Sequence, residues 1–271
     1  MSIANIHNNE LFYTVIGAGL PCLVMHGGLG FDHTYLHPWL DSLGDTLQLI
    51  YYDHRGNGRS GRPDRETMTH AQLAADADAL AAYLGHGKVA VIGHSYGGFI
   101  ALELALRYPD RLSHLILLDT APTFDYFEEI FANAHRMGAT DEMMTAAQEV
   151  WSTDEEMRER FGIIWPLYFK NFDPEIGARL LENVVVSISG SAREGEAEAY
   201  NVVPRLAEIQ TPTLVLVGRE DFVCPPSQAH ILHEGIPNSE LVIFEKSGHL
   251  PYVEEAELFF DTVRDWIRRN S

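Results

Sequence analysis

A Gly-x-Ser-x-Gly motif between an apolar run and a helix-like run constrains this chain most strongly. The motif spans residues 93–97 with Ser95 at its centre, and it follows the apolar residues 89–92 and precedes the helix-like residues 99–106. A sharp turn from a strand into a helix needs glycines two residues before and after the serine, because larger side chains would collide there. We therefore predict that Ser95 is a nucleophile whose Oγ projects from this turn; an ordinary serine in a tight turn is the alternative.

A serine becomes an effective nucleophile only beside a base that takes its proton and a carboxylate that orients the base. Residues 213–217 predict a buried strand, and Asp221 lies on the loop after it. Residues 241–244 predict the next strand, which is followed by a loop that carries His249. Serine, acid and histidine therefore follow one another in the chain order expected for this kind of turn.

Three separated motifs in this order resemble the α/β-hydrolase family over nearly the whole chain: the serine turn, a Gly-x-x-Asp segment ending at Asp221 and a Gly-His pair ending at His249. The resemblance implies an α/β fold with a mostly parallel central sheet, helices on both faces and a helical cap insertion. It also implies that Ser95 attacks the substrate, His249 acts as general base and then general acid, and Asp221 holds the imidazole. Glu220 is a chemically able rival of Asp221, but Asp221 has the family's spacing.

The developing oxyanion needs hydrogen-bond donors, which usually come from the backbone N–H after the nucleophile and from an early loop. Tyr96 supplies the first. Residues 26–30 form a glycine-rich loop that resembles the family's, which implies the amide of Gly28 as the second donor; a simple glycine-rich turn is the alternative. His26 and His94 lie beside glycines at strand ends, and we predict that both are structural histidines rather than bases.

Residues 56–61 also match Gly-x-Gly-x-x-Gly after the predicted strand 47–52, so a dinucleotide-binding oxidoreductase is the competing class of protein. Such a site requires the glycines to open a helix that faces the pyrophosphate. Here no apolar periodicity begins until about Leu73, so we do not expect a nucleotide site. Residues 53–60 instead resemble a loop of many α/β-hydrolases, which implies a mainly architectural role.

Composition narrows the class of protein further. With 271 residues, of which 46% are hydrophobic, the chain is long enough for one catalytic domain with an insertion. The formal net charge of -20 argues against a nucleic-acid or anionic-membrane partner. We see no signal peptide and no apolar run near the roughly 20 residues that span a bilayer, so we expect a cytoplasmic protein.

Neither cysteine usage nor metal-ligand spacing indicates a bound group. Cys22 and Cys224 lack a Cys-x-x-Cys spacing, so we expect both to be reduced. No cluster of His, Cys, Asp and Glu has convincing metal-ligand spacing. We therefore predict no metal and no cofactor, and the oligomeric state stays open.

The remaining pattern predicts the layout of the domain. We expect a core of residues 1–121 and 206–271, and a helical cap of residues 122–205 that is rich in aromatic and Met side chains. We expect most of these side chains to form the cap's own core and a few to line a pocket, which the sequence does not identify. A helix at residues 71–84 should pack on the sheet and carry Asp76 away from the packed face. Short strands are predicted around residues 10–16, 21–26, 47–52, 88–92, 113–118, 213–217 and 241–244.

The loops at residues 26–30 and 52–60, together with the serine turn, resemble the prolyl aminopeptidase (proline iminopeptidase) subgroup, which binds a substrate's amino terminus through cap glutamates. The chain departs from that subgroup at Leu29, where proline is usual, and lacks the subgroup's Asn-Glu-Phe and Glu-Asn-His-Tyr cap segments. An acidic run is usually a solvated face. The acidic candidates at the end of the cap are Glu182, Glu194, Glu196 and Glu198.

We therefore predict a serine hydrolase that cleaves a small carboxylic ester, or a lactone, through Ser95. A prolyl aminopeptidase-like enzyme acting on short peptides is the alternative, and a non-turnover small-ligand binding protein ranks third. Ser95 at the nucleophile position argues against haloalkane dehalogenases and epoxide hydrolases, which resemble this fold but use aspartate there.

Overall fold

The computed structural model describes residues 2–28, 30–190 and 200–271. Within them an eight-stranded sheet has the order β1-β2-β4-β3-β5-β6-β7-β8. β1 pairs antiparallel with β2, and β2 pairs antiparallel with β4. Every other neighbouring pair in this sheet is parallel. The predicted mostly parallel sheet is therefore confirmed.

The strands are β1 (Ser2–Ile6), β2 (Asn9–Ile16), β3 (Leu20–Met25), β4 (Leu47–Tyr52), β5 (Val89–His94), β6 (Leu112–Leu118), β7 (Thr213–Gly218) and β8 (Ser239–Phe244). The α-helices are α1 (His70–Tyr83), α2 (Tyr96–Arg107), α3 (Phe127–Arg136), α4 (Asp141–Gln148), α5 (Asp154–Ile164), α6 (Pro174–Leu181), α7 (Pro226–Gly235), α8 (Pro251–Glu254) and α9 (Ala256–Asn270). The short 3₁₀ helices are η1 (His33–Tyr35), η2 (Asp41–Asp45), η3 (Arg65–Thr67), η4 (Pro109–Arg111), η5 (Trp165–Tyr168), η6 (Ile188–Gly190) and η7 (Val203–Glu208).

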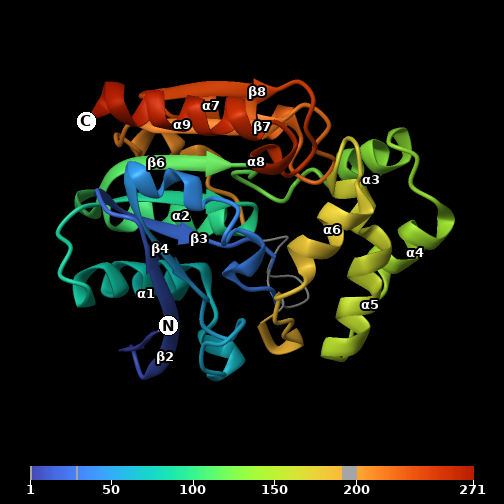
Figure 1. Cartoon of the computed structure of the whole chain (residues 1–271), viewed down its shortest axis with the longest axis horizontal. Helices are drawn as coiled ribbons and strands as arrows, with labels where there is room; N and C mark the ends of the chain where they lie inside the picture. The colour runs from blue at the N-terminus through green and yellow to red at the C-terminus, as the bar shows by residue number, and fades with distance from the viewer. Residues whose placement is uncertain (1, 29, 191–199) are drawn as a thin grey trace.

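Helices cover both faces of the sheet (Figure 1). Val89 and Val91 of β5 point into a cluster shared with α1, α2 and α7. Ala90 and Ile92 point the other way, into a cluster shared with α9 and part of the cap. All residues of β5 are buried. A strand buried on both faces appears in sequence as an unbroken apolar run, which is why this strand could be predicted.

The structure corrects the expectation for Asp76. The predicted helix is α1, but Asp76 is buried rather than turned away from the packed face. Arg55 Nε donates to Asp76 Oδ2 at 2.5 Å and Nη2 donates to Oδ1 at 2.7 Å. A buried carboxylate is tolerated when it is paired and hydrogen-bonded in this way. The ion pair joins the loop after β4 to α1.

Helices α3 to α6 stand together at the right of the view in Figure 1, beyond the end of the sheet. A single antiparallel bridge between Thr123 and Asn201 brings the two ends of this segment together. We interpret residues 122–205 as a cap on the core of residues 1–121 and 206–271. Of this segment, residues 191–199 lie outside the described part.

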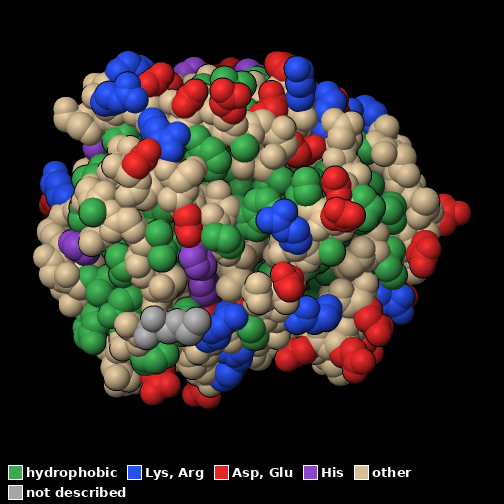
Figure 2. All heavy atoms as spheres, viewed as in Figure 1, with side chains coloured by type: hydrophobic (Ala, Val, Ile, Leu, Met, Phe, Trp, Pro, Cys, Tyr) green, Lys and Arg blue, Asp and Glu red, His purple; other side chains and the backbone are tan. Residues whose placement is uncertain are grey.

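Charged side chains of both signs are mixed over the face shown in Figure 2, with several acidic side chains projecting from the end formed by α4 and α5. In the described part of the chain, no helix has the length and apolar character needed to cross a membrane.

Candidate active site

Ser95 lies in a strained turn between β5 and α2, with φ 54° and ψ -122°. A non-glycine residue with positive φ costs of order 1–3 kcal/mol and needs surrounding structure to hold it. The Ser95 N–H donates to Leu118 O at 2.9 Å, and the Thr120 hydroxyl donates to Ser95 O at 2.7 Å. A Cβ at Gly97 would lie 2.2 Å from Met25 O, so only glycine fits there. The sequence-predicted turn is therefore present, and Ser95 is partly exposed in it.

Asp221 and His249 are brought together from the loops after β7 and β8. His249 Nδ1 and Asp221 Oδ2 lie 2.7 Å apart, and both side chains are buried. Asp221 Oδ1 also accepts the N–H groups of Val223 at 3.0 Å and Cys224 at 2.9 Å. Because an ionised carboxylate only accepts hydrogen bonds, Nδ1 must carry the proton, which leaves Nε2 of a neutral imidazole as the proton acceptor.

Glu220 does not take part in this contact. Its Oε2 accepts a hydrogen bond from Arg136 at 2.6 Å, at the surface. Of the Glu220 and Asp221 carboxylates, the one that contacts the His249 imidazole is therefore that of Asp221.

The loops that carry the acid and the histidine approach one another very closely. A Cβ at Gly218 would lie 1.8 Å from Gly248 O, so the glycine of the Gly-x-x-Asp segment lets the two loops touch. The His249 N–H donates to Tyr168 O at 2.7 Å. Tyr168 belongs to η5, so the cap segment helps to fix the backbone of His249.

Ser95 and His249 line the same cavity. Among the described residues, no hydrogen bond joins Ser95 Oγ to the imidazole. Such contacts are commonly long until a substrate is bound, so their length does not exclude a nucleophile and base pair. The structure brings all members of the predicted Ser95, Asp221 and His249 set to one place.

The two predicted oxyanion donors belong to the early loop and to the start of α2. Gly28 lines the cavity and has φ +56°, and a Cβ there would collide with the Phe31 ring at 2.5 Å. Tyr96 is the first residue of α2. The first N–H groups of a helix have no intrahelical partner, and the helix dipole favours negative charge near them. The amides of Gly28 and Tyr96 are the candidate donors to an oxyanion.

His26 and His94 are buried structural residues, as predicted. His26 Nδ1 lies 2.9 Å from Gly27 O, and His26 Nε2 accepts the His54 N–H at 3.1 Å. His94 Nδ1 lies 2.7 Å from the Tyr35 hydroxyl, and its Nε2 lies 3.1 Å from His249 O. Burial lowers the pKa of both imidazoles, so both are held neutral. His94 lines the cavity but is already engaged on both ring nitrogens.

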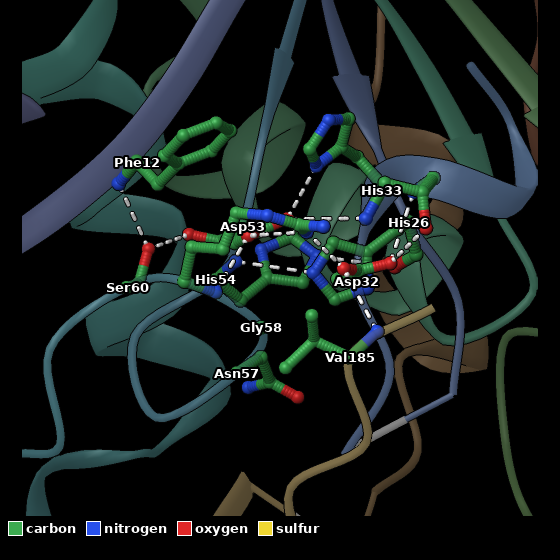
Figure 3. A network of polar contacts seen from close by, with 12 residues as sticks. Phe12, His26, Asp32, His33, Asp53, His54, Asn57, Gly58, Ser60 and Val185 are labelled. Carbon is green, nitrogen blue, oxygen red and sulfur yellow. Dashed lines mark hydrogen bonds and ion pairs between the residues drawn. The ribbon is translucent and has the colours of Figure 1, made fainter. Parts of the chain in front are cut away.

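A buried polar network supports the early loop (Figure 3). Asp53 Oδ1 lies 2.6 Å from His33 Nδ1 and accepts the His33 N–H at 3.1 Å. Burial alone would raise the pKa of Asp53, but the hydrogen bond and charge of His33 outweigh it and leave the pKa below its ordinary value. Asp32 Oδ2 accepts from the Arg59 guanidinium and from the Val185 N–H, the latter at 3.1 Å. The network therefore ties the cap to the core near Gly28.

Two clusters have the residue types of a metal site. The first joins Asp32, His33 and Asp53. Its carboxylate oxygens already accept hydrogen bonds, and the Arg59 guanidinium supplies the positive charge. Because hydrogen-bond donors and a guanidinium already surround these carboxylates, the cluster fits an ion-pair network better than a cation site.

The second cluster joins Asp221, Cys224 and His249. Burial raises the pKa of the Cys224 thiol well above its ordinary value, whereas a metal ligand must be a thiolate. Asp221 and His249 are also hydrogen-bonded to one another. Both Cys22 and Cys224 are free and buried.

The glycines of residues 56–61 do not open a helix. The next α-helix, α1, begins at His70, and the Gly56 N–H donates to Gly61 O at 2.9 Å within the loop. Asn57 Oδ1 accepts the N–H of Gly30 at 2.6 Å. The loop therefore supports the early glycine-rich loop rather than a pyrophosphate.

The cavity at Ser95 has a volume of about 60 Å³ and a mostly apolar wall. The sequence indicated that a few cap aromatics would line a pocket, and Phe161, Trp165 and Tyr168 do so. Leu181 of α6 and Phe31 of the early loop, which sequence reasoning did not single out, complete the apolar side. No lysine, arginine, aspartate or glutamate is among the described residues that line it.

Comparison with known proteins places the chain among enzymes. The sequence model of the alpha/beta hydrolase fold matches residues 21–256. The proline iminopeptidase PfmaB of Pestalotiopsis fici is 29% identical over 99% of this chain and 100% of its own length. The putative carbamate hydrolase RutD of Rhizobium rhizogenes is 27% identical over 92% of this chain and 93% of its own.

A solved structure gives the same result. A thermophilic esterase from Thermogutta terrifontis superposes with a TM-score of 0.77 at 28% identity, covering 99% of this chain and 98% of the esterase. The similarity therefore extends over the core and the cap segment together.

Proposed function

The chain belongs to the alpha/beta hydrolase fold family, and we propose that it is a serine hydrolase that cleaves small, uncharged carboxylic esters or lactones through an acyl-enzyme on Ser95. Asp221 and His249 complete the catalytic triad, and the amides of Gly28 and Tyr96 form the oxyanion hole. The proposal includes no metal and no cofactor.

The wall of the cavity carries this choice of substrate. Its lining includes Ser95 and His249, and most of the rest is apolar, with Phe161, Trp165 and Leu181 among it. A pocket for a drug-sized ligand measures about 300–1,000 Å³, so a cavity of about 60 Å³ favours a short acyl group. A protonated amino terminus in such a wall would lose its hydration without gaining a carboxylate partner.

The proposed mechanism uses the contacts described above. Ser95 Oγ attacks the carbonyl carbon while its proton passes to His249 Nε2, and the oxyanion is stabilised by the N–H groups of Gly28 and Tyr96. Protonated His249, stabilised by Asp221, then gives this proton to the leaving alkoxide, and the acyl group stays on Ser95. A water molecule, deprotonated by His249, attacks the acyl carbon, the bond to Ser95 Oγ breaks, and His249 returns the proton to Oγ, which releases the acid and the free serine.

Removal of an N-terminal residue from short peptides is the second candidate, because PfmaB and several other relatives are named proline iminopeptidases. Such an activity needs a carboxylate for the substrate's amine. Glu182 is exposed and does not line the cavity, while Glu194, Glu196 and Glu198 lie outside the described residues. The part of the pocket that is described therefore favours the ester.

The test compares the wild type with Ser95→Ala on p-nitrophenyl acetate and butyrate and on prolyl and alanyl p-nitroanilides. Ester turnover that is lost in the variant supports the proposal. Preferential cleavage of the unblocked prolyl anilide would replace it with the aminopeptidase. A slow single turnover that leaves a persistent adduct would favour the small-ligand binding protein. Thermal melting of both proteins controls for folding, since alanine keeps the Cβ and the backbone of the turn.

A further inference from the structure

A second buried carboxyl, Asp119, lies next to Asp221. Asp119 directly follows β6, is fully buried and has a positive φ of 46°. β6 and β7 are neighbours in the sheet, so their carboxyl ends place Asp119 beside the loop that carries Asp221. Strained backbone of this kind persists only where the surroundings impose it.

The hydrogen bonds of Asp119 leave one oxygen unexplained. Oδ1 accepts the Gly218 N–H at 2.9 Å, and the Asp119 N–H donates to Leu216 O at 2.8 Å. Oδ2 is buried and has no donor among the described residues. Gly218 joins Asp119 to Asp221, because its O accepts the Asp221 N–H at 3.2 Å, and the Asp221 side chain acts on the Asp119 carboxyl through its charge and a hydrogen-bond contact. Two ionised carboxylates can only accept, so this contact is favourable only if one of them carries a proton.

The surroundings decide which carboxyl holds the proton. Asp221 accepts N–H groups from Val223, Cys224 and the His249 ring, all of which stabilise the ionised form. Asp119 accepts only the Gly218 N–H from the described residues. Burial, and then the charge of Asp221, raise the pKa of Asp119 well above its ordinary value.

Among the described residues, the other titratable groups that act on Asp119 bring no positive charge. Glu254 of α8 raises the pKa of Asp119 further. Tyr35, Tyr252 and Cys224 also respond to the charge of Asp119, and burial raises the pKa of each, so all three are neutral at pH 7. The proton is therefore best placed on Asp119 Oδ2.

We propose that Asp119 is a positioning residue that stays protonated and donates a hydrogen bond from Oδ2 to the Asp221 carboxylate, which holds Asp221 ionised and aimed at His249. The effect of Asp119 on catalysis depends on the triad proposed above, whereas the presence of the proton on Asp119 does not. Asp119 acts through Asp221 and does not line the cavity at Ser95.

The proton is tested by infrared spectroscopy at pH 7, independently of any turnover. The wild type minus Asp119→Asn difference spectrum should contain the C=O stretch of a protonated carboxyl, because asparagine removes that group and keeps the shape and both hydrogen bonds. No such band in the difference spectrum would overturn the proposal. The proposal would also be overturned if the band disappeared in Asp221→Asn but remained in Asp119→Asn, since the proton would then lie on Asp221.

The positioning role is tested by comparing Asp119→Asn with Asp119→Leu, which has a similar shape and no donor. Because Asp119→Leu loses a hydrogen bond to a charged group, it should lower kcat about 10- to 100-fold with KM little changed. Asp119→Asn keeps a donor and should stay within about threefold of the wild-type kcat. The far-downfield proton resonance of His249 Nδ1–H should shift in the Leu variant only. This resonance remains a readout even if the ester assays fail.

Asp76→Asn is the matched control, because Asp76 is a buried carboxylate remote from the cavity whose loss weakens the fold. It should leave the His249 resonance unchanged. If the Asn and Leu variants of Asp119 lose activity equally, or if neither loses any, the positioning role is wrong.

Discussion

The pH dependence of stability gives a quantitative prediction for Asp119→Asn. In the native protein burial raises the pKa of Asp119 well above its ordinary value, whereas in the unfolded chain the pKa returns to roughly 3.9. Between these values the native state binds one proton more than the unfolded state, so the free energy of unfolding falls as the pH rises. The stability from this group is fully present below the unfolded pKa and is lost as the pH approaches the folded pKa.

The slope is about 1.4 kcal/mol per pH unit, and asparagine removes it because an amide does not titrate in this range. Between pH 5.5 and 7.5 the free energy of unfolding of Asp119→Asn should therefore rise relative to wild type, by about 3 kcal/mol at most, which is the limit for one proton over two pH units. Other titrating groups are common to both proteins and cancel in the difference. Urea unfolding at several pH values measures it. Parallel curves for the two proteins would show that Asp119 is ionised in the native state and would refute the reasoning.

Further predictions concern the site and its support. Asp221→Asn should lower kcat about 10⁴-fold, because the imidazole loses its orienting carboxylate, while Glu220→Gln should stay within about twofold; equal losses would remove Asp221 from its role. Gly97→Ala should lower the free energy of unfolding by about 3 kcal/mol in urea, because its Cβ would meet Met25 O, whereas Gly87→Ala has open space and should cost little; similar costs would count against the tight turn. Phe161→Ala should enlarge the cavity and raise kcat/KM for octanoate relative to acetate esters about tenfold, and an unchanged ratio would place the acyl group elsewhere.

Local sequence signals predicted most of the sheet but not its first strand. Central strands such as β5 are buried on both faces and appear as apolar runs. β1 (Ser2–Ile6) is short and lies at the edge of the sheet, and only Ala4 and Ile6 of this strand are buried. A five-residue segment whose apolar residues do not alternate regularly with polar ones gives too weak a pattern to predict.

Features that depend on which elements are neighbours could not be predicted from the chain. Asp119 was visible as the residue after a strand, yet its meeting with Asp221 follows from β6 lying beside β7. Asp76 gave the pattern of an exposed helix position because its partner, Arg55, belongs to a distant loop. The choice of Phe161 as a pocket residue depends in the same way on how the cap packs on the core.

The meeting of Ser95, Asp221 and His249 was predictable because they follow strand ends, and the carboxyl ends of parallel strands meet at one edge of a sheet. Ser95 follows β5, and Asp221 and His249 lie in the loops after β7 and β8. Their chain order, their glycine neighbours and the resemblance to the family led to the predicted set, and its catalytic role stays a proposal. Whether Ser95 Oγ forms a hydrogen bond with the His249 imidazole depends on side-chain geometry that no sequence pattern encodes.

Covalent labelling shows whether Ser95 is the nucleophile. The protein and its Ser95→Ala variant are incubated with a fluorophosphonate, and the intact masses and the labelled peptide are measured. We expect one adduct per wild-type chain, located on Ser95, and none on the variant. Equal labelling of the two proteins, or an adduct on another residue, would contradict this expectation.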